Sequence, residues 1–181
     1  MSELFSIQLQ NRQQQGRDGV WLDLPTTTEQ VQAALRQIGI SSDNPQGLFI
    51  SGYFAEEEKR FAISYNMVLA SNVDELNFLA SRLETLSTGE RAELNAALQA
   101  PQSELFSIGR ITDFPENVDY YVHLPDVHGP AQLGDYYLNR SGMVDMPEEW
   151  KGGIDTAQFG RYVAQQEQGV FTQYGYLVKS G

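Results

Sequence analysis

The chain has 181 residues, 41% of them hydrophobic and 11% aromatic, which is enough for one ordinary domain or for two or three very small ones. It has no cysteine, which excludes disulfide bonds, thiolate catalysis and cysteine-ligated zinc. Twenty-four acids against twelve Lys and Arg residues give a net charge of −12, which disfavours nucleic acid and anionic membranes as partners and favours a basic protein.

The first sixty residues predict a small ββαβ unit. Hydrophobic and polar residues alternate over 5–11 (FSIQLQN) and again over 20–25 (VWLDLP), with a polar, glycine-containing turn at 13–19 between them. A helix is predicted over 26–40, with Thr26 and Glu29 at capping-box spacing and Gly39 placed to end it. A third strand is predicted over 47–54 (GLFISGYF).

The middle of the chain predicts helices. Ser71 is the expected cap of a helix over 72–86, and Ser87 with Glu90 forms a capping box before a second helix that ends ahead of Pro101. One apolar face of the first helix is expected to be buried, and its members are Val73, Leu76, Leu79, Leu83 and Leu86.

The acids are evenly divided between the two halves of the chain but not within the second half. Residues 1–90 and 91–181 each hold twelve acids and six bases, so there is no acidic tail. Residues 111–150, however, carry eight acids against Arg140 alone, a net charge of −7. The eight are Asp113, Glu116, Asp119, Asp126, Asp135, Asp145, Glu148 and Glu149. Because they are spaced out, a folded segment would display them as separate points of charge.

The last third combines two short helices with a closing strand. One helix is predicted from Pro130 to Gly142, and the other begins at Asp155 as its N-cap and turns Phe159 inward. A strand is predicted over 169–178 (GVFTQYGYLV).

No catalytic, cofactor or metal site stands out. HLPDVH (123–128) groups His123, Asp126 and His128, but Pro125 disrupts helical ligand spacing and no further His or Cys completes a ligand set. Asp155 and Arg161 could form an acid–Arg catalytic pair, although a helix cap with a later arginine is the simpler interpretation. Nothing distinguishes one carboxylate pair for acid–base catalysis among twenty-four acids.

Several segments, in this order and spacing, resemble the ArdA antirestriction proteins over nearly the whole chain. The most telling are Trp21 to Pro25 ahead of the first helix, Asp74 to Asn77, and Ile154-Asp155 followed by Gly160-Arg161. Further similarity lies in 48–54 and in 169–178.

The resemblance implies a non-enzymatic homodimer carried by mobile genetic elements. It would inhibit Type I restriction–modification enzymes by imitating the charge of B-form DNA. The implied fold is an elongated α+β chain of three small domains: an α+β domain at 1–65, a helical domain at 66–112 and an acidic α+β domain at 113–181. No cofactor is implied. With no signal peptide or membrane span in the sequence, a cytoplasmic location is expected.

The sites follow from the resemblance together with the charge pattern. The carboxylates expected to contact the enzyme are the eight acids of 111–150 and Asp155, whose helix Arg161 is expected to hold in place. The aromatic side chains of the last third include the candidates for a dimer interface, which are Phe159, Tyr162, Phe171 and Tyr174.

Two other functions stay open at this stage. An acidic protein could instead dock on another DNA-binding protein, such as a nucleoid protein or a repressor. A small hydrolase with a carboxylate pair would be marked by a pocket holding an acid of strongly raised pKa.

Overall fold

A computed structural model describes residues 3–14, 18–41, 43 and 45–179. The fold is α+β, as predicted, with eight α-helices and two three-stranded sheets among these residues. Contacts gather the chain into two compact units, Met1–Leu86 with Leu105–Pro115 and Ser87–Glu104 with Glu116–Gly181. The division into three domains remains a prediction. No helix in the described ranges has the length and apolarity needed to cross a bilayer.

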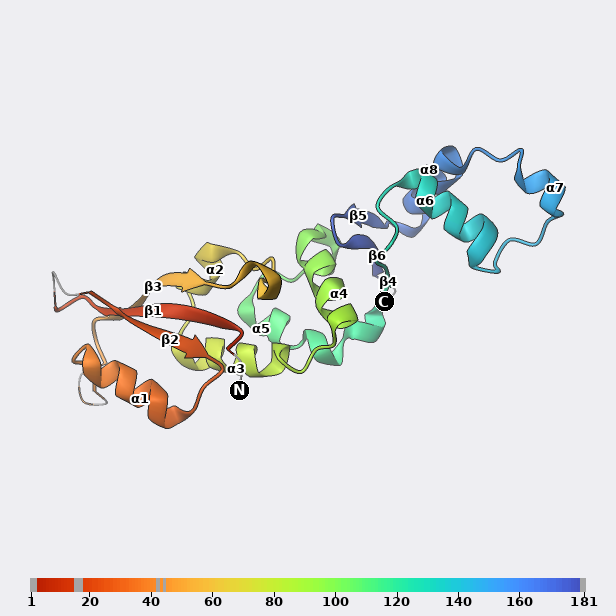
Figure 1. Ribbon diagram of the computed structural model, residues 1–181. Coiled ribbons are helices and arrows are strands. Elements are labelled where there is room, and N and C mark those ends of the chain that lie inside the picture. The colour runs from red at the N-terminus through yellow and green to blue at the C-terminus, as the bar shows by residue number, and fades with distance from the viewer. Residues whose placement is uncertain (1–2, 15–17, 42, 44, 180–181) are drawn as a thin grey trace. The chain divides into compact units, whose positions relative to one another are not determined.

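The first unit contains the predicted ββαβ arrangement. Strand β1 (Phe5–Asn11) lies between β2 (Val20–Leu24) and β3 (Leu48–Phe54), and both pairings are antiparallel (Figure 1). The alternation along β1 buries Phe5, Ile7 and Leu9 on one face of the sheet, as expected from the sequence. The predicted turn at 13–19 lies partly outside the described residues, at 15–17.

Helix α1 (Thr28–Gln37) begins one residue later than the capping-box pattern predicts. Its N-cap is Thr27, whose hydroxyl accepts from Gln30 N at 3.3 Å, so the prediction of Thr26 was wrong. The backbone of Thr26 is committed elsewhere, because Asn77 accepts from its N–H at 2.8 Å and donates to its carbonyl at 3.0 Å. The helix ends ahead of Gly39, whose φ of 75° suits glycine.

The other helices of the first unit are η1 (Glu57–Lys59), α2 (Tyr65–Leu69), α3 (Val73–Leu83) and α5 (Ile108–Thr112), with η3 (Phe114–Glu116) at the unit boundary. Helix α5 packs against α3, and α2 packs against β3. All five residues of the predicted apolar face are buried. The N-cap of α3 is Asn72 and not Ser71, whose hydroxyl donates to the Glu75 carboxylate at 3.1 Å.

The second unit begins with α4 (Thr88–Gln99), which carries the predicted Ser87/Glu90 capping box. Short 3-10 turns follow as η2 (Pro101–Ser103) and η4 (Val118–Tyr120). Next come α6 (Pro130–Asp135), the π-helical turn η5 (Tyr136–Arg140), α7 (Glu148–Lys151) and α8 (Thr156–Glu167).

The sheet of the second unit differs from expectation in two ways. Its strands β4 (Tyr121–Leu124), β6 (Gly175–Lys179) and β5 (Val170–Thr172) pair antiparallel in that order, and β4 falls in a segment where no strand was predicted. The single strand predicted over 169–178 is a hairpin, because the chain turns at Gly175, where φ is 117°.

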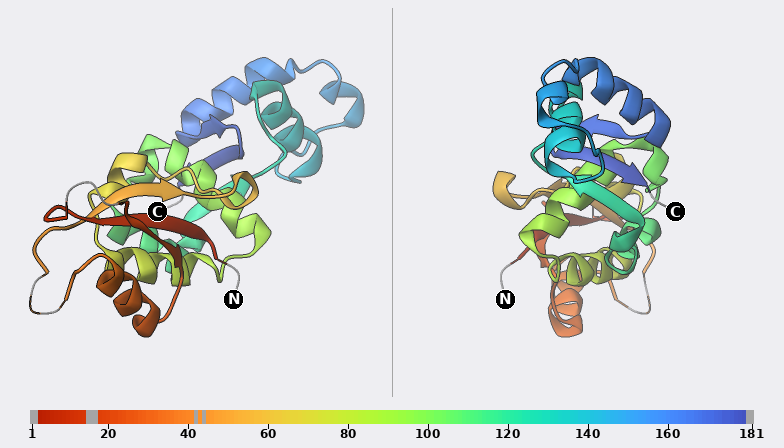
Figure 2. Two further views of the ribbon diagram at one scale, coloured as in Figure 1. Left: turned by 60° about the vertical axis from the view of Figure 1, so that its left-hand side comes forward. Right: turned by 90° about the vertical axis from the view of Figure 1, so that its right-hand side faces the viewer.

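Two glycines let α6 and α8 approach closely, and the helices lie side by side in both figures (Figures 1 and 2). A Cβ on Gly134 would overlap the carbonyl oxygen of Thr156, and a Cβ on Gly160 would overlap that of Pro130. Backbone therefore packs against backbone here, which only glycine permits.

A carboxylate joins three elements of the second unit. Tyr176 of β6 is fully buried and donates to Glu167 Oε2 at 2.6 Å, and Tyr137 of η5 donates to Glu167 Oε1. Gly169 leaves the room that the Tyr176 hydroxyl occupies. Burial first, and the Glu167 carboxylate second, raise the pKa of both phenols, which keeps them protonated as donors.

Candidate functional site

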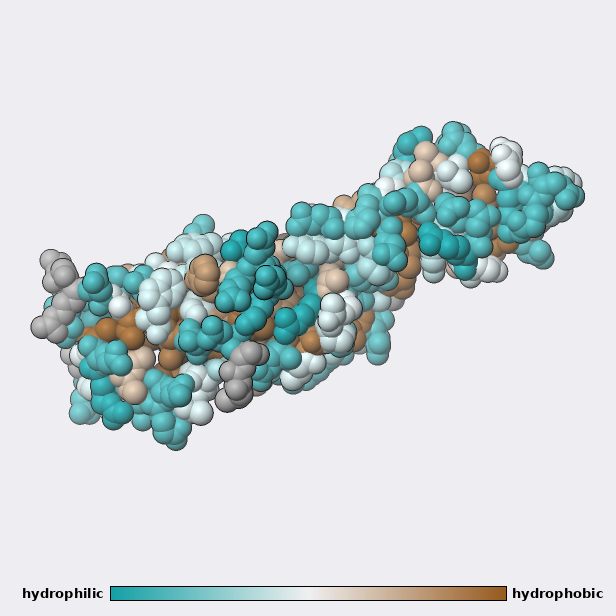
Figure 3. Space-filling view, viewed as in Figure 1, coloured by the Kyte–Doolittle hydropathy of each residue, from teal (hydrophilic) through white to brown (hydrophobic). Residues whose placement is uncertain are grey.

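The acidic side chains lie at the surface. All twenty-four fall within the described residues, and nineteen are exposed, five are half-buried and none is buried. Hydrophilic side chains cover most of the face drawn in Figure 3, with small hydrophobic patches between them. The first unit holds twelve acids and seven bases, and the second holds twelve acids and five bases, so their net charges are −5 and −7.

Seven of the eight acids of 111–150 are exposed, and Asp135 is half-buried. Asp113 belongs to the first unit and the other seven to the second. Arg140 Nε lies 3.7 Å from Asp135 Oδ2 and Lys151 Nζ lies 3.0 Å from Glu148 Oε1, and the carboxylate side chain of each pair is at least 50% exposed. Such pairs contribute little free energy and leave the local charge strongly negative.

Four acids of this segment make no ion pair with any residue that the structure describes, and all four are exposed: Asp119, Asp126, Asp145 and Glu149. Helix α7 holds Glu149 in a short turn after Pro147, where Trp150 N donates to the Pro147 carbonyl at 3.0 Å. These carboxylates are available to a basic partner.

Asp155 caps a helix and is also exposed. Its Oδ1 accepts from Gln158 N at 3.1 Å, which confirms the predicted N-cap of α8. Arg161 is exposed and makes no hydrogen bond or ion pair with another described residue, so the expectation that it holds this helix in place was wrong. The close packing of Gly160 on Pro130 performs that role instead.

Glu93 of α4 is the acid with the most strongly raised pKa. Half-burial, together with the charges of Glu90 and Asp119, raises its pKa from 4.5 to about 7. A raised pKa of this kind can mark a catalytic acid. Here the neighbours that contribute charge are two more carboxylates, so the local structure is a crowded acidic cluster.

The two histidines of HLPDVH bond to the backbone of the closing hairpin. His123 Nε2 lies 2.8 Å from the Tyr174 carbonyl oxygen, and His128 Nδ1 lies 3.4 Å from that of Thr172. Across the described residues, no group of three or more His, Asp or Glu side chains is arranged to hold a metal ion.

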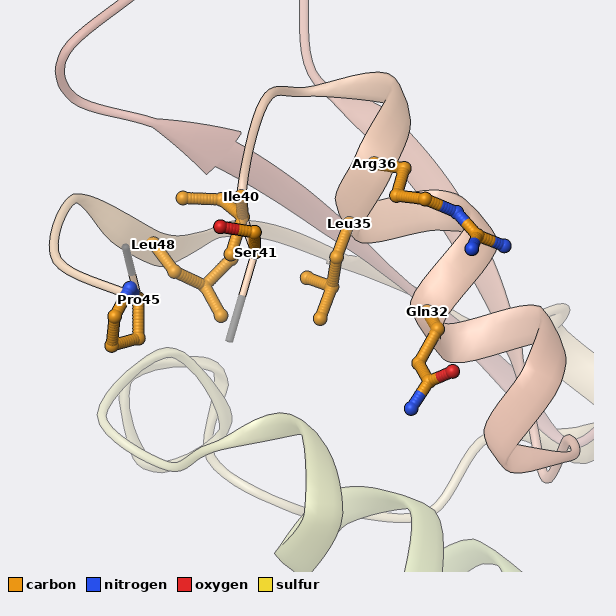
Figure 4. Close-up of a pocket in the computed structure, with 7 residues that line it drawn as sticks. All are labelled: Gln32, Leu35, Arg36, Ile40, Ser41, Pro45 and Leu48. Atoms are coloured by element: carbon orange, nitrogen blue, oxygen red, sulfur yellow. The ribbon is translucent and has the colours of Figure 1, made fainter. Parts of the chain in front are cut away.

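The first unit has an open, largely apolar hollow of about 410 Å³ beside α1. Leu35 and Leu48 point toward one another across it, and Arg36 lies at its rim (Figure 4). No carboxylate lines this hollow, so it offers no acid–base pair to a substrate. Glu93 belongs to the other unit.

The family model of the antirestriction protein ArdA matches residues 15–178, nearly the whole chain. This chain belongs to the ArdA antirestriction family. No curated protein matches it. For an ArdA protein, the exposed carboxylates are the candidate surface for contact with a restriction enzyme.

The four aromatic residues considered for an ArdA dimer interface differ in exposure. Phe171 packs on the core formed by Val127, Leu133 and Tyr176, with its ring centroid 5.0 Å from that of Tyr176. Phe159 and Tyr174 are half-buried, whereas Tyr162 on α8 is 60% exposed. Tyr162 is therefore the most accessible of the four.

Proposed function

We propose that this ArdA protein inhibits Type I restriction–modification enzymes by presenting its carboxylates where those enzymes bind the phosphates of DNA. Antirestriction activity follows from the family. A restriction enzyme must hold duplex DNA, and the basic groups that bind phosphates attract a suitably charged protein as well.

The observation that carries the proposal is the exposure of the acids. Duplex DNA presents about one negative charge per 1.7 Å of helix axis, so a competitor has to keep many carboxylates in solvent at fixed positions. Nineteen of the twenty-four acids here are exposed, and none is buried. The folded backbone fixes the positions of these acidic residues relative to their neighbours, whereas a disordered acidic tail would leave them variable.

The distribution of charge supports the second unit as the main surface for contact with the restriction enzyme. It carries −7, and Asp126, Asp145 and Glu149 make no ion pair with a described residue. The proposed contact set is the one expected from the sequence, namely Asp113, Glu116, Asp119, Asp126, Asp135, Asp145, Glu148, Glu149 and Asp155.

The first test is the plating efficiency of unmodified phage on a host with a Type I system. We expect the protein to raise the efficiency, since restriction is blocked. If plating is unchanged while the protein is present and folded, Type I inhibition is wrong, and pull-downs against other DNA-binding proteins would then identify the partner.

A pair of triple variants tests which acids matter. The variant Asp126→Asn, Asp145→Asn, Glu149→Gln should weaken inhibition of DNA cleavage by about tenfold, since each exposed charge pair contributes up to about 1 kcal/mol. The matched variant Glu58→Gln, Asp74→Asn, Glu84→Gln removes three exposed acids from the first unit. Equal loss in both variants would mean that total charge, and not this surface, governs inhibition.

We further infer that the protein acts as a homodimer, with Tyr162 at or near the interface. Exposed aromatic side chains are favoured at interface centres. Because each chain carries −12, pairing should strengthen as salt rises, whereas binding to a basic target should weaken. Sedimentation should show a dimer for the wild type and the Gln158→Asp control, and a monomer for Tyr162→Asp. A monomeric wild type at micromolar concentration would contradict this.

A further inference from the structure

The outward face of the first sheet holds a group of side chains with no role in the core. Because β1 turns Ile7 and Leu9 inward, Ser6 and Gln8 point outward. The register places Asp23 and Phe54 on either side of Ser6, and Trp21 and Gly52 on either side of Gln8.

Two aromatic rings form the walls of a hollow on this face. Trp21 is 49% exposed and Phe54 is 55% exposed, and with Ser6 between them they line an open space of about 260 Å³. The indole reaches across β1 toward β3, where a Cβ built on Gly52 would lie 3.1 Å from Trp21 Cη2. The sheet therefore holds the indole in place without covering it.

Carboxylates adjoin the hollow. Ser6 Oγ donates to Asp23 Oδ1 at 2.5 Å, which fixes that carboxylate beside the floor. Glu3 lies next to it, and a hydrogen bond to Asp23 and the Asp23 charge raise the pKa of Glu3. Two acids this close repel each other, and a bound cation would relieve the repulsion.

The neighbouring cations of the chain have other contacts. Lys59 Nζ donates to the Glu3 carbonyl at 3.2 Å and lies 3.9 Å from Glu56, and Arg60 donates to the Ala55 carbonyl at 3.0 Å. Neither residue lines the space between the two rings. The hollow thus combines aromatic walls with an adjacent carboxylate, the composition that recognises an organic cation.

We propose that this hollow binds an arginine side chain of the partner protein, with the guanidinium stacked on Trp21 and bonded to Asp23. Arginine fits better than lysine, because a planar guanidinium stacks on aromatic rings and pairs with carboxylates through two donors. The inference rests on the proposed function, in which the partner is an enzyme that grips DNA with basic side chains. It adds a contact in the first unit that the acids of 111–150 do not supply.

Fluorescence tests the site without the enzyme. The chain has two tryptophans, so Trp150→Phe leaves Trp21 as the reporter and Trp21→Phe leaves Trp150. A hexa-arginine peptide should change Trp21 emission saturably and at several-fold lower concentration than hexa-lysine, and Asp23→Asn should weaken the response. Equal curves for the two peptides, or the same saturable change from Trp150, would overturn the proposal.

Inhibition of a Type I enzyme tests the site in the complex. Trp21→Leu and Asp23→Asn should each inhibit about tenfold less well than the wild type, with Phe78→Leu as an exposed aromatic control on α3. Asp23→Asn is nearly isosteric and guards against a folding defect. If both variants inhibit like the wild type, the arginine site is wrong while the proposed function stands. If the wild type fails to inhibit, the proposed function is wrong, and the peptide titration still decides the site.

Discussion

Different contacts stabilise the interiors of the two units of this ArdA protein. Among the described residues, twenty-four buried hydrophobic side chains belong to the first unit and nine to the second, three of them alanines. Yet the second unit carries the larger negative charge. Each unit holds twelve acids, so the difference in net charge comes from the bases, seven in the first unit and five in the second.

Two features stabilise the second unit in addition to its small core. They are the close packing of two helix backbones and the half-buried carboxylate of Glu167. Gly134 and Gly160 bring α6 and α8 together, and Tyr137 and Tyr176 both donate to Glu167. These contacts use little apolar area. The comparison therefore implies that single changes at these points should disturb the second unit more than similar changes disturb the first.

The largest effect is expected for Gly160→Leu. A side chain at this position overlaps the Pro130 carbonyl, so α8 has to move away from α6. We expect a loss of about 3 kcal/mol or more and a lower unfolding midpoint by circular dichroism. Gly152→Ala is the control, because nothing lies within 4 Å of a Cβ there. If Gly160→Leu is as stable as the wild type, close backbone packing does not stabilise the second unit in the way inferred here.

The second largest effect is expected for Tyr176→Phe, which removes the hydrogen bond that the buried Tyr176 hydroxyl donates to Glu167. A hydrogen bond to a charged group contributes about 1.5–3 kcal/mol, so stability should fall by about that amount in chemical denaturation. Tyr174→Phe removes a hydroxyl that has no hydrogen bond to a described residue and should change little. Equal effects would show that the carboxylate does not hold these elements together.

In the first unit, Asn77→Ala removes the two bonds to the Thr26 backbone. The larger apolar core should limit the loss to about 1–2 kcal/mol, as expected for two neutral hydrogen bonds. Phe78→Ala, at a 59% exposed neighbour, is the control. A loss greater than that of Gly160→Leu would reverse the order of the two units.

The effect of Glu93→Gln depends on pH, and it is expected to be the smallest because solvent screens this half-buried carboxylate. The folded protein raises the pKa of Glu93 from 4.5 to about 7, so between these values the folded state binds more protons than the unfolded state. Stability contributed by this group is therefore present at low pH and lost as pH rises toward 7 and above. Glu93→Gln should raise the melting temperature at about pH 8 and leave it unchanged near pH 4. The exposed control Glu149→Gln should leave the melting temperature unchanged at both pH values.

Local patterns predicted the fold of the first unit well. Alternation along 5–11 and the apolar face of 72–86 were confirmed because a large core enforces them. The helix starts at Thr26 and Ser71 were each wrong by one residue. Thr26 is held by Asn77, fifty-one positions away, and no local pattern contains that contact.

The second unit was harder to predict because its contacts are distant in sequence and its strands are short. Strand β4 has four residues, and the hairpin at 169–178 turns on the positive φ of Gly175. The bond from Tyr137 to Glu167 spans thirty positions. Charge spacing predicted an exposed position for the acids of 111–150, which holds for all of them except the half-buried Asp135. Their partner and their alignment with phosphates stay predictions.

The measurement that tests the central claim most directly is competition between this protein and duplex DNA for a Type I enzyme. Labelled DNA is bound to the enzyme, and the protein is added at several DNA concentrations and two salt concentrations. We expect DNA to be displaced, the half-maximal protein concentration to rise in proportion to the DNA concentration, and binding to weaken at high salt. A half-maximal concentration independent of DNA, with protein and DNA bound to the enzyme together, would contradict DNA mimicry.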